Sequence, residues 1–282
     1  MLIKLTHLKN KKILEYICYI LIAVTIFDLF RFAWKFEAFT NKDYLFPNTK
    51  SLSYLQSQKG QFRIMATDSK ILPPNFSAIY KLQSVDSYDP LYLERYGELV
   101  AASERDMPNI NPPFGFNRII TPRNFESKII DLLGVKYVLS LSDISSNKLK
   151  KVYQEGQTRL YENTKALPRA FFVEKTIFSQ SKEETIREMF ASNLEKIAIV
   201  ENAKSSDWQI GEAEVIDYEE NKVVIATENK GDGFMVLTDS FYPSWHATID
   251  GKETGIVRSD FNFRGIVVPR GTHRIEFYIT LL

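Results

Sequence analysis

The stretch RIEFYITL, residues 274–281, decides how the C-terminal part of the chain folds. Apolar side chains occupy every second position of this stretch, at Ile275, Phe277, Ile279 and Leu281. Successive side chains of a β-strand point to opposite faces, so the alternation predicts a strand with one buried face. A strand of this kind needs partner strands to cover that face, and the preceding residues supply them.

Strand patterns recur at the short, regular spacing of about 8 to 12 residues that is typical of β-sandwiches. They cover residues 209–217, 221–227, 233–240, 244–249, 254–258, 261–268 and 272–281. The intervening turns contain residues that tolerate a positive φ or preset a bend, at Asn229-Lys-Gly-Asp-Gly233, Asp250-Gly251 and Pro269-Arg-Gly271. Residues 206–282 are therefore predicted to form an antiparallel β-sandwich-like unit.

Helical and strand patterns alternate in the preceding residues. Helices are predicted at residues 51–57, 90–103, 121–134 and 181–190, and strands at 61–66, 135–141 and 196–200. Thr121-Pro122 has the features of a helix start and Gly134 of a helix end, while Ser181 and Glu184 form a capping-box pattern. Residues 43–205 are therefore predicted to form a mixed α/β unit, which makes the whole chain α+β.

Residues 13–34 form a long apolar stretch with few interruptions. As a helix they would span about 33 Å, close to the roughly 30 Å of a bilayer core. Glu15, Asp28 and Arg31 lie near its two ends, where their charges can reach the interfaces. A cleaved signal peptide and an amphipathic soluble helix are the alternatives, but no small-x-small cleavage pattern follows before Phe39. An uncleaved transmembrane helix is therefore the favoured interpretation.

The charges that flank this helix predict its orientation. Residues 1–12 form a basic tail that contains Lys4, Lys9, Lys11 and Lys12 and no acidic residue. The positive-inside rule places such a tail in the cytoplasm and the residues from about 40 onward outside. The single cysteine, Cys18, permits no internal disulfide, which is ordinary for an external domain of a bacterium. The expected location is the bacterial cytoplasmic membrane.

Composition and motifs exclude several classes of function. The 36 basic and 35 acidic side chains give a net charge of +1, so nucleic acid is not expected as a partner. One cysteine cannot build a zinc ribbon or an iron–sulfur site. The sequence contains no GxSxG, GxGxxG or HExxH motif and no phosphate-binding glycine loop. We therefore expect no catalytic residue, no metal site and no cofactor in this chain.

Residues 84–96 contain the densest cluster of polar and aromatic side chains. The candidate binding residues in it are Asp86, Tyr88, Asp89, Tyr92 and Arg95. Carbohydrate sites combine such groups, because aromatic rings stack on the C–H faces of sugars while carboxylates and arginine hold the hydroxyls. The alternative, which is the stronger of the two on sequence alone, is that Asp86 and Asp89 flank a helix N-terminus and stabilise it without any ligand.

A second cluster lies in residues 239–251 and adds Tyr242, Trp245 and Asp250 as candidate binding residues. Pro243 ends one strand, and Asp250-Gly251 is typical of a hairpin turn, so folding alone explains most of this cluster. Exposure of Tyr242 and Trp245 would favour a surface for a sugar or a partner. Burial of the two rings would make them part of the core.

Several motifs follow one another in a recognisable order. They are Asp28-Leu29, Tyr54-Leu55 before Arg63, Pro74-Asn75, Tyr88-Asp89 with Arg95-Tyr96, Leu132-Leu133-Gly134-Val135-Lys136-Tyr137, Leu167-Pro168-Arg169-Ala170, Tyr242-Pro243-Ser244-Trp245 to Asp250-Gly251, Arg264-Gly265 and Pro269-x-Gly271-x-His273. Together they resemble the C-terminal extracytoplasmic region of YfhO-type bacterial membrane proteins, a family that is similar to GT-C glycosyltransferases. The chain departs from the family at Ser244, where glycine is usual.

The resemblance implies transfer of a sugar from a polyprenyl-phosphate carrier to an acceptor of the cell envelope. GT-C-like proteins carry their catalytic acid in an early external loop that this chain lacks, so no catalytic residue is carried over. The chain is then an accessory, substrate-engaging domain, and its expected partners are the lipid bilayer, the lipid-linked sugar or an envelope glycan, and a polytopic membrane subunit or upstream region. The alternatives are a self-standing anchored carbohydrate-binding module and a structural or assembly module.

Overall fold

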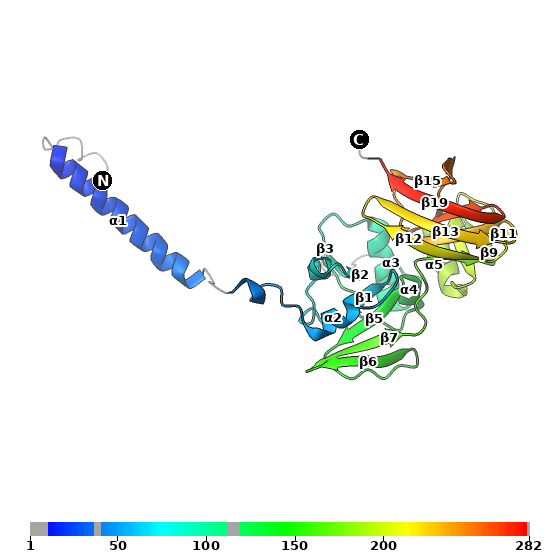
Figure 1. Cartoon of the computed structure of the whole chain (residues 1–282), viewed down its shortest axis with the longest axis horizontal. Helices are drawn as coiled ribbons and strands as arrows, with labels where there is room; N and C mark the ends of the chain where they lie inside the picture. The colour runs from blue at the N-terminus through cyan, green and yellow to red at the C-terminus, as the bar shows by residue number, and fades with distance from the viewer. Residues whose placement is uncertain (1–10, 37–40, 112–118, 281–282) are drawn as a thin grey trace. The chain divides into compact units, whose positions relative to one another are not determined.

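The computed structural model describes residues 11–36, 41–111 and 119–280, which are arranged in two compact units (Figure 1). One unit is Met1–Asn48 and the other is Thr49–Leu282. Two predictions fall outside the described residues. They are the conformation of the basic tail through residue 10, with Lys4 and Lys9, and the end of the last strand at Leu281.

The first unit contains the predicted apolar helix. Helix α1 (Lys11–Phe36) extends the predicted range by two residues at each end. By length and composition it can cross a membrane, and none of its most apolar window is buried in the structure. Its apolar side chains are distributed around the whole circumference, which is typical of a membrane span and not of an amphipathic surface helix. A signal segment would pass the same test, and the orientation of α1 stays a prediction.

A mixed five-stranded sheet opens the second unit. Its order is β2-β1-β5-β7-β6, and β1 runs parallel to both of its neighbours. The strands are β1 (Arg63–Ala66), β2 (Gln83–Ser84), β5 (Val135–Ser140), β6 (Leu149–Glu155) and β7 (Thr158–Asn163). Helix α2 (Lys50–Gln56) packs Leu52 and Leu55 against Ile64 and Leu139 of this sheet. The 3-10 helix η3 (Phe76–Tyr80) lies in the connection from β1 to β2, whereas the 3-10 helix η2 (Lys42–Tyr44) belongs to the first unit.

Two further sheets contain most of the remaining strands. The seven-stranded sheet has the order β11-β9-β10-β17-β18-β14-β8, and the antiparallel five-stranded sheet has the order β12-β13-β19-β15-β16. The first contains β8 (Ala170–Val173), β9 (Lys175–Ser179), β10 (Ile197–Glu201), β11 (Ser206–Asp207), β14 (Gly233–Ser240), β17 (Val257–Ser259) and β18 (Phe263–Val268). The second contains β12 (Gly211–Tyr218), β13 (Lys222–Asn229), β15 (Trp245–Ile249), β16 (Lys252–Thr254) and β19 (Gly271–Ile279).

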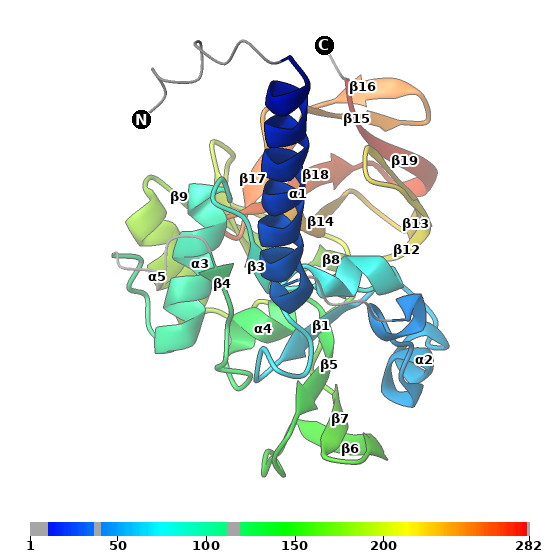
Figure 2. The ribbon, with the colours of Figure 1, turned by 90° about the vertical axis from the view of Figure 1, so that its left-hand side faces the viewer.

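These two sheets pack face to face, which confirms the predicted sandwich-like arrangement. Figure 2 shows β13 and β19 beside β14 and β18. Ile275 and Phe277 of β19, the strand quoted at the outset, are buried against Met235 and Leu237 of β14. The alternation of apolar and polar residues along β19 predicted one buried face, and the structure confirms this, because that face of the strand lies in the sandwich core.

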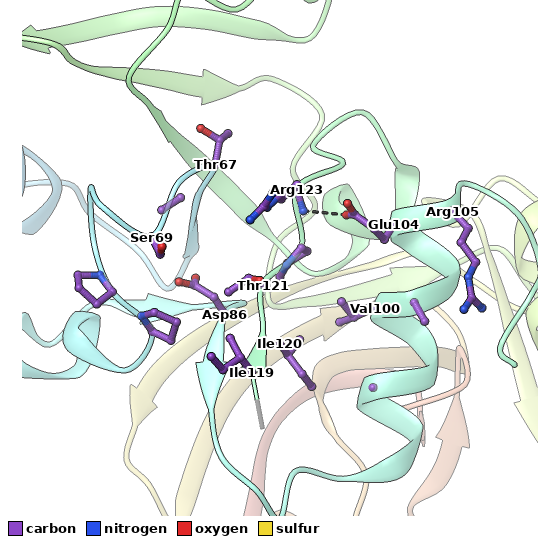
Figure 3. Close-up of a pocket in the computed structure, with 16 residues that line it drawn as sticks. Thr67, Ser69, Asp86, Val100, Glu104, Arg105, Ile119, Ile120, Thr121 and Arg123 are labelled. Atoms are coloured by element: carbon purple, nitrogen blue, oxygen red, sulfur yellow. Dashed lines mark hydrogen bonds between the residues drawn. The ribbon is translucent and has the colours of Figure 1, made fainter. Parts of the chain in front are cut away.

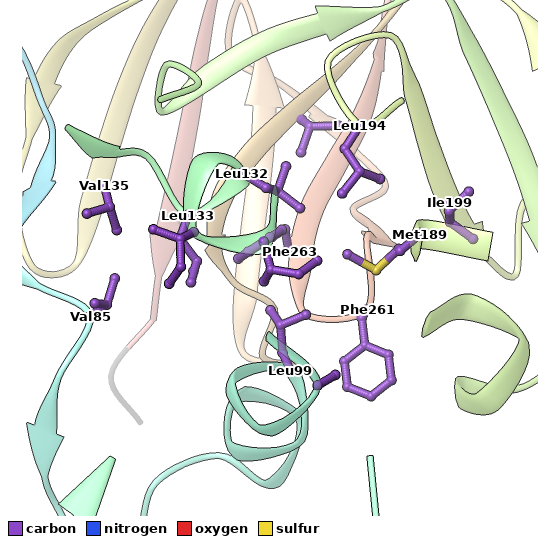
Figure 4. Close-up of a cluster of buried hydrophobic side chains, with 14 of the residues drawn as sticks. Val85, Leu99, Leu132, Leu133, Val135, Met189, Leu194, Ile199, Phe261 and Phe263 are labelled. Atoms are coloured by element: carbon purple, nitrogen blue, oxygen red, sulfur yellow. The ribbon is translucent and has the colours of Figure 1, made fainter. Parts of the chain in front are cut away.

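Helices cover the opposite face of the seven-stranded sheet. They are α3 (Glu94–Arg105), α4 (Lys128–Leu132) and α5 (Lys182–Ala191). Figure 4 shows Leu99 of α3 and Met189 of α5 around Phe261 and Phe263. Phe234 and Val236 of β14 point into this core, whereas the intervening Met235 points into the sandwich. The central strands of the seven-stranded sheet are therefore apolar on both faces.

The boundary expected between residues 205 and 206 falls inside the second unit. Strand β10, which precedes it, pairs with β17, which follows it, through Val200 and Ser259. Strand β8 likewise pairs with β14. One sheet takes strands from both sides of this position, and the cluster of buried residues under α3, α4 and α5 does the same, so residues 49–282 form one compact unit.

Two helices start later than their sequence patterns indicate, and the larger difference is at α4, since α3 begins at Glu94 instead of residue 90. The helix expected from Thr121 begins at Lys128, and its cap is Ser127, whose Oγ accepts a hydrogen bond from the Ile129 amide at 3.3 Å. The Glu104 carboxylate accepts hydrogen bonds from the amides of Arg123 and Asn124 at 2.7 and 2.8 Å. These bonds hold the backbone of Arg123 and Asn124 against α3 in a non-helical segment, which a turn at residues 125–126 joins to the helix.

Gly265 in β18 provides a test of the packing between the sandwich strands. A methyl group at this position would overlap Ser259 Oγ and the ring of Phe234, which is fully buried. We expect Gly265→Ala to lower the free energy of unfolding by about 1–3 kcal/mol, because the core has to move apart. The matched control is Gly255→Ala, since a Cβ there meets nothing within 4 Å. Denaturant unfolding of both variants measures the difference, and equal midpoints would contradict the expectation.

Candidate binding site around Asp86

A cavity of about 770 Å³ lies between α3 and the loops that follow β1, β2 and β4 (Figure 3). Its volume is in the range of sites for small organic ligands, about 300–1,000 Å³. We call it the Asp86 cavity. Its polar lining residues are Thr67, Ser69, Asp86, Glu104, Arg105, Thr121 and Arg123, and its apolar lining residues include Pro73, Pro74, Val100, Ala101, Ile119 and Ile120. Strand β4 (Ile119–Ile120), which pairs with β3 (Ser87–Tyr88), contributes the last two.

Two hydrogen bonds hold the backbone of Val85, the residue that precedes Asp86. The Val85 amide donates to the Ile64 carbonyl of β1 at 3.2 Å, and the Tyr96 hydroxyl of α3 donates to the Val85 carbonyl at 2.6 Å. Val85 itself is buried. The parallel pairing of β1 with β2 and the helix α3 therefore fix the position from which the Asp86 side chain enters the cavity.

Asp86 is a buried acid, with 9% of its surface exposed. Burial raises the pKa of its carboxyl group above the ordinary value, and a hydrogen bond from Ser84 Oγ partly opposes this effect. No cation forms an ion pair with Asp86 in the part of the chain that the structure describes. A buried carboxyl group without a cationic partner keeps free capacity to accept hydrogen bonds from a ligand.

Arg123 supplies a positive charge to the same cavity. Its amide is held by the Glu104 carboxylate, as described above, which fixes the segment that carries it. Figure 3 shows the Arg123 side chain extending toward the side of the cavity that carries Thr67 and Ser69. The cavity thus combines two acids, two guanidinium groups and three hydroxyl groups with walls made of proline and aliphatic side chains.

The other residues of the first sequence cluster lie outside this lining. Tyr88 is 46% exposed, and the Asp89 carboxylate accepts a hydrogen bond from the Leu91 amide at 2.8 Å. The Tyr92 ring packs against Gly97 of α3. Arg95 forms an ion pair with Glu201 at 2.9 Å, and its guanidinium group lies over the Phe261 ring. Of the five candidates, only Asp86 lines the cavity.

The structure also answers the helix-capping alternative. The N-cap residue of α3 is Leu93, and no side chain caps this helix. Asp89 forms a turn with Leu91 before the helix begins, and Asp86 lies one strand further upstream. Neither carboxylate therefore caps α3, and the burial of Asp86 needs another explanation.

The second sequence cluster lies on the sandwich. Trp245 is partly buried in the sandwich core, and the Arg264 guanidinium group stacks on its ring at 3.6 Å from the centroid. Tyr242 is 49% exposed. Asp250 accepts hydrogen bonds from His273 Nδ1 at 2.7 Å and from the Arg274 amide at 2.9 Å. None of Tyr242, Trp245 and Asp250 is among the described residues that line the Asp86 cavity.

The contacts of Asp250 explain why several motifs occur together. Its φ of 50° and the φ of 79° at Gly251 form the turn between β15 and β16. The amide of Arg274 and the ring of His273 lower the pKa of Asp250, and the same hydrogen bond raises the pKa of His273. The turn at Asp250-Gly251 is therefore hydrogen-bonded to the segment that contains His273, and these bonds help to hold β15 beside β19.

Sequence reasoning missed Thr67, Ser69, Thr121 and Arg123. These residues are distant from Asp86 along the chain, and the crossover from β1 to β2 and the contact of Glu104 with residue 123 bring them together. The available signal was the pair of proline-containing segments at Pro73-Pro74 and Pro122, which cannot continue a helix or a central strand. The second also has the features of a helix start, which is the structure that the sequence predicts there.

The arrangement of charged, hydroxyl and apolar side chains is suited to binding a small polar ligand. Over residues 11–36, 41–111 and 119–280, no group of three or more His, Cys, Asp or Glu side chains could hold a metal ion. The described lining contains no histidine, cysteine or lysine that could serve as base or nucleophile. Comparisons of the chain with protein-family models, curated proteins and solved structures found no match. The assignment of a function therefore rests on the geometry of the cavity.

Proposed function

We propose that residues 49–282 form the extracytoplasmic, substrate-engaging domain of a membrane glycosyltransferase-like protein of the bacterial cell envelope. The domain binds a saccharide in the Asp86 cavity and is not catalytic by itself. The observation that carries the proposal is a buried, unpaired carboxyl group in a cavity of ligand size. The length of α1 and the resemblance to YfhO-type proteins support the membrane context.

The chemistry of the lining fits a saccharide. A sugar hydroxyl donates to Asp86, while Arg123 donates to a further hydroxyl or to the phosphate of a polyprenyl-phosphate sugar. Pro73, Pro74 and Ile119 supply an apolar wall for the C–H face of the ring. A polytopic membrane subunit or upstream region would provide the catalytic acid and the cavity for the lipid chain, because one helix cannot enclose a lipid-linked donor.

Asp86→Asn tests the role of the buried acid. We expect the variant to bind saccharide at least about tenfold more weakly, since a hydrogen bond to a charged group is worth about 1.5–3 kcal/mol. In the wild type, binding should weaken as the pH falls through the raised pKa of Asp86, because the carboxylate becomes protonated. The variant should lose this pH dependence. Calorimetric titration of the full chain in detergent with envelope glycan fragments and a short-chain prenyl-phosphate hexose measures both effects.

Asp89→Asn is the matched control. It makes the same chemical change three residues away, at an exposed carboxylate that binds the Leu91 amide and does not line the cavity. Equal losses in the two variants would argue against the cavity as the site. If no glycan and no prenyl-phosphate sugar binds the wild type, the proposal is wrong. An assembly module then becomes the better reading, because Trp245 and Asp250 serve the packing of the sandwich.

A further inference from the structure

Exposed apolar side chains concentrate in one short part of the second unit. Eleven large apolar side chains described in residues 49–282 are exposed, and five of them lie between residues 76 and 93. These five are Phe76, Ile79, Tyr88, Leu91 and Leu93, and we call them the 76–93 surface. Leu91 is 86% exposed, more than any other residue of this kind. A group of exposed apolar side chains usually marks a surface that binds a protein partner or a membrane.

Hydrogen bonds hold the parts of the 76–93 surface in place. Asn75 Nδ2 donates to the Tyr88 carbonyl at 2.7 Å, and the Tyr88 amide donates to Asn75 Oδ1 at 2.9 Å. These bonds tie the start of η3 to β3. The Asp89 carboxylate accepts from the Leu91 amide, which fixes the turn that presents Leu91. The exposed side chains therefore project from an ordered scaffold and not from a free loop.

The 76–93 surface adjoins the Asp86 cavity. Pro74 and Asp86 both line the cavity, and each lies two residues from a member of the surface, Phe76 and Tyr88 respectively. Whatever covers this surface will therefore lie next to the cavity. Its composition of tyrosine, phenylalanine and aliphatic residues matches the side chains that proteins place at the boundary between lipid headgroups and acyl chains.

We propose that the 76–93 surface docks on the outer leaflet of the bilayer, so that the Asp86 cavity opens at the membrane surface. The inference rests on the anchorage by α1 that is part of the proposed function. Twelve residues join Phe36 to Thr49, and a chain of this length spans at most roughly 45 Å. The bilayer is therefore always within reach of the second unit, at a high effective concentration.

This covalent link explains why so small a surface can suffice. A few apolar side chains would bind a free domain to lipid only weakly. In a tethered domain docking becomes an intramolecular step, so a weak surface can be occupied most of the time. The consequence for the proposed function is that the cavity would meet the headgroup region, where the sugar of a lipid-linked donor lies.

The single cysteine makes a direct test possible. In a Cys18→Ser background, Ile79→Cys and Ile216→Cys each carry one environment-sensitive fluorophore, and the full chain is reconstituted in phosphatidylcholine–phosphatidylglycerol vesicles. Ile79 and Ile216 are matched, since they are 48% and 49% exposed, but Ile216 lies in β12 of the sandwich. Lipids with a nitroxide near the headgroup should quench the label at position 79 at least about twofold more than the label at 216.

Leu91→Asp supplies the second arm of the test. Added to the Ile79→Cys chain, it should reduce the quenching to the level at position 216, and the high exposure of Leu91 predicts an unchanged unfolding midpoint. Equal quenching at positions 79 and 216, or quenching that Leu91→Asp leaves unchanged, overturns the docking and leaves a protein partner as the occupant of the surface.

The quenching experiment tests the membrane docking independently of the proposed saccharide binding. Quenching is measured without saccharide, so a chain that binds no glycan but shows the expected quenching would overturn the saccharide site and support the docking. Flotation of the labelled chain with vesicles checks the anchorage by α1. A chain that does not float overturns the anchorage and the docking together, whereas floating with equal quenching overturns the docking alone.

Discussion

Asp239→Asn is expected to lower the free energy of unfolding by about 3–5 kcal/mol, because it leaves buried arginines without their counter-charge. Asp239 Oδ1 accepts hydrogen bonds from Arg169 Nη2 at 2.6 Å and from Arg63 Nη2 at 3.0 Å. The Tyr218 hydroxyl lies 3.1 Å from Oδ2. Asparagine has nearly the same shape, so the variant removes the charge with little change in volume.

Asp239 and the three arginines that act on it, Arg63, Arg169 and Arg264, form a buried charge cluster in which three positive charges face one negative charge. Burial opposes the ionisation of Asp239, but Arg169, Arg63 and Arg264 together outweigh it and hold the pKa of Asp239 below its ordinary value. Burial also lowers the pKa of Arg63 and of Arg264 to about 10. A depressed carboxyl pKa stabilises the fold above the pKa of the unfolded chain, and this contribution is lost only as the pH falls through the lower folded value. At neutral pH the whole effect is present.

The cluster joins all three large sheets. Arg63 belongs to β1, Arg169 immediately precedes β8, and Tyr218 ends β12. Arg63 also donates to the carbonyls of Leu133 and Thr238, each at 2.6 Å. Loss of the central charge should therefore loosen the junction between the sheets, and not only one strand.

Denaturant unfolding of the full chain in detergent, followed by tryptophan fluorescence, measures this effect. The control is Glu174→Gln, which breaks the 2.8 Å ion pair with Lys196. Both side chains of that pair are about half exposed, so the expected loss is below about 1 kcal/mol. A loss in Asp239→Asn as small as that in Glu174→Gln would show that the cluster is solvated or that its arginines find other partners.

The parts of the fold that follow local rules could be predicted from the sequence. The strands of residues 206–282 could be located because alternation and turn residues are local signals, and Asp250-Gly251 forms the expected turn. The pairing of β10 with β17 could not be predicted, since nothing near Val200 indicates that Ser259 lies beside it. The late start of α4 was missed for the same reason, because Glu104 of another helix holds the preceding segment.

The residues of the candidate site could likewise be predicted from the sequence only in part. Asp86 could be selected from its neighbourhood of polar and aromatic residues, but Tyr92 and Arg95 belong to the same neighbourhood and serve packing and an ion pair. A sugar site and a folded core use the same side-chain types, and only burial and partners distinguish them. The sequence gives no sign that Arg123 lines the same cavity as Asp86, because a cavity between a helix and three loops has no sequence period.

Asp260 is expected to make the fold less stable as the pH rises from about 4 to about 7. Its side chain is fully buried, and Oδ1 accepts a hydrogen bond from the Ile199 amide at 2.8 Å. Oδ2 has no hydrogen-bond partner among the described residues. Burial, only partly opposed by the Ile199 bond, raises the pKa of Asp260 from 3.8 to about 7. A buried acid with one unsatisfied oxygen is more stable protonated.

The direction of the pH effect follows from where the proton binds. Between the two pKa values the folded chain holds a proton on Asp260 that the unfolded chain has released. Raising the pH through this interval therefore favours unfolding, and above about pH 7 the loss is complete. A pKa that moves from 3.8 to about 7 corresponds to about 4 kcal/mol.

Asp260→Asn should abolish this part of the pH dependence and raise the free energy of unfolding at pH 8 by up to about 4 kcal/mol. The asparagine carbonyl can still accept from the Ile199 amide, and asparagine tolerates the φ of 46° at this position.

Asp207→Asn on the exposed strand β11 is the control, and it should leave the pH dependence of the unfolding free energy unchanged. Burial also raises the pKa of Asp86, so a slope of the same sign should remain in Asp260→Asn and decrease further when Asp86→Asn is added. The raised pKa of His273 leaves a loss of stability of the same sign above about pH 6.5 in all of these variants. Denaturant unfolding of the full chain between pH 4 and pH 8 measures these slopes. An equal pH dependence of the wild type and of Asp260→Asn would mean that the pKa of Asp260 is not raised in the folded chain, and the expectation would then be wrong.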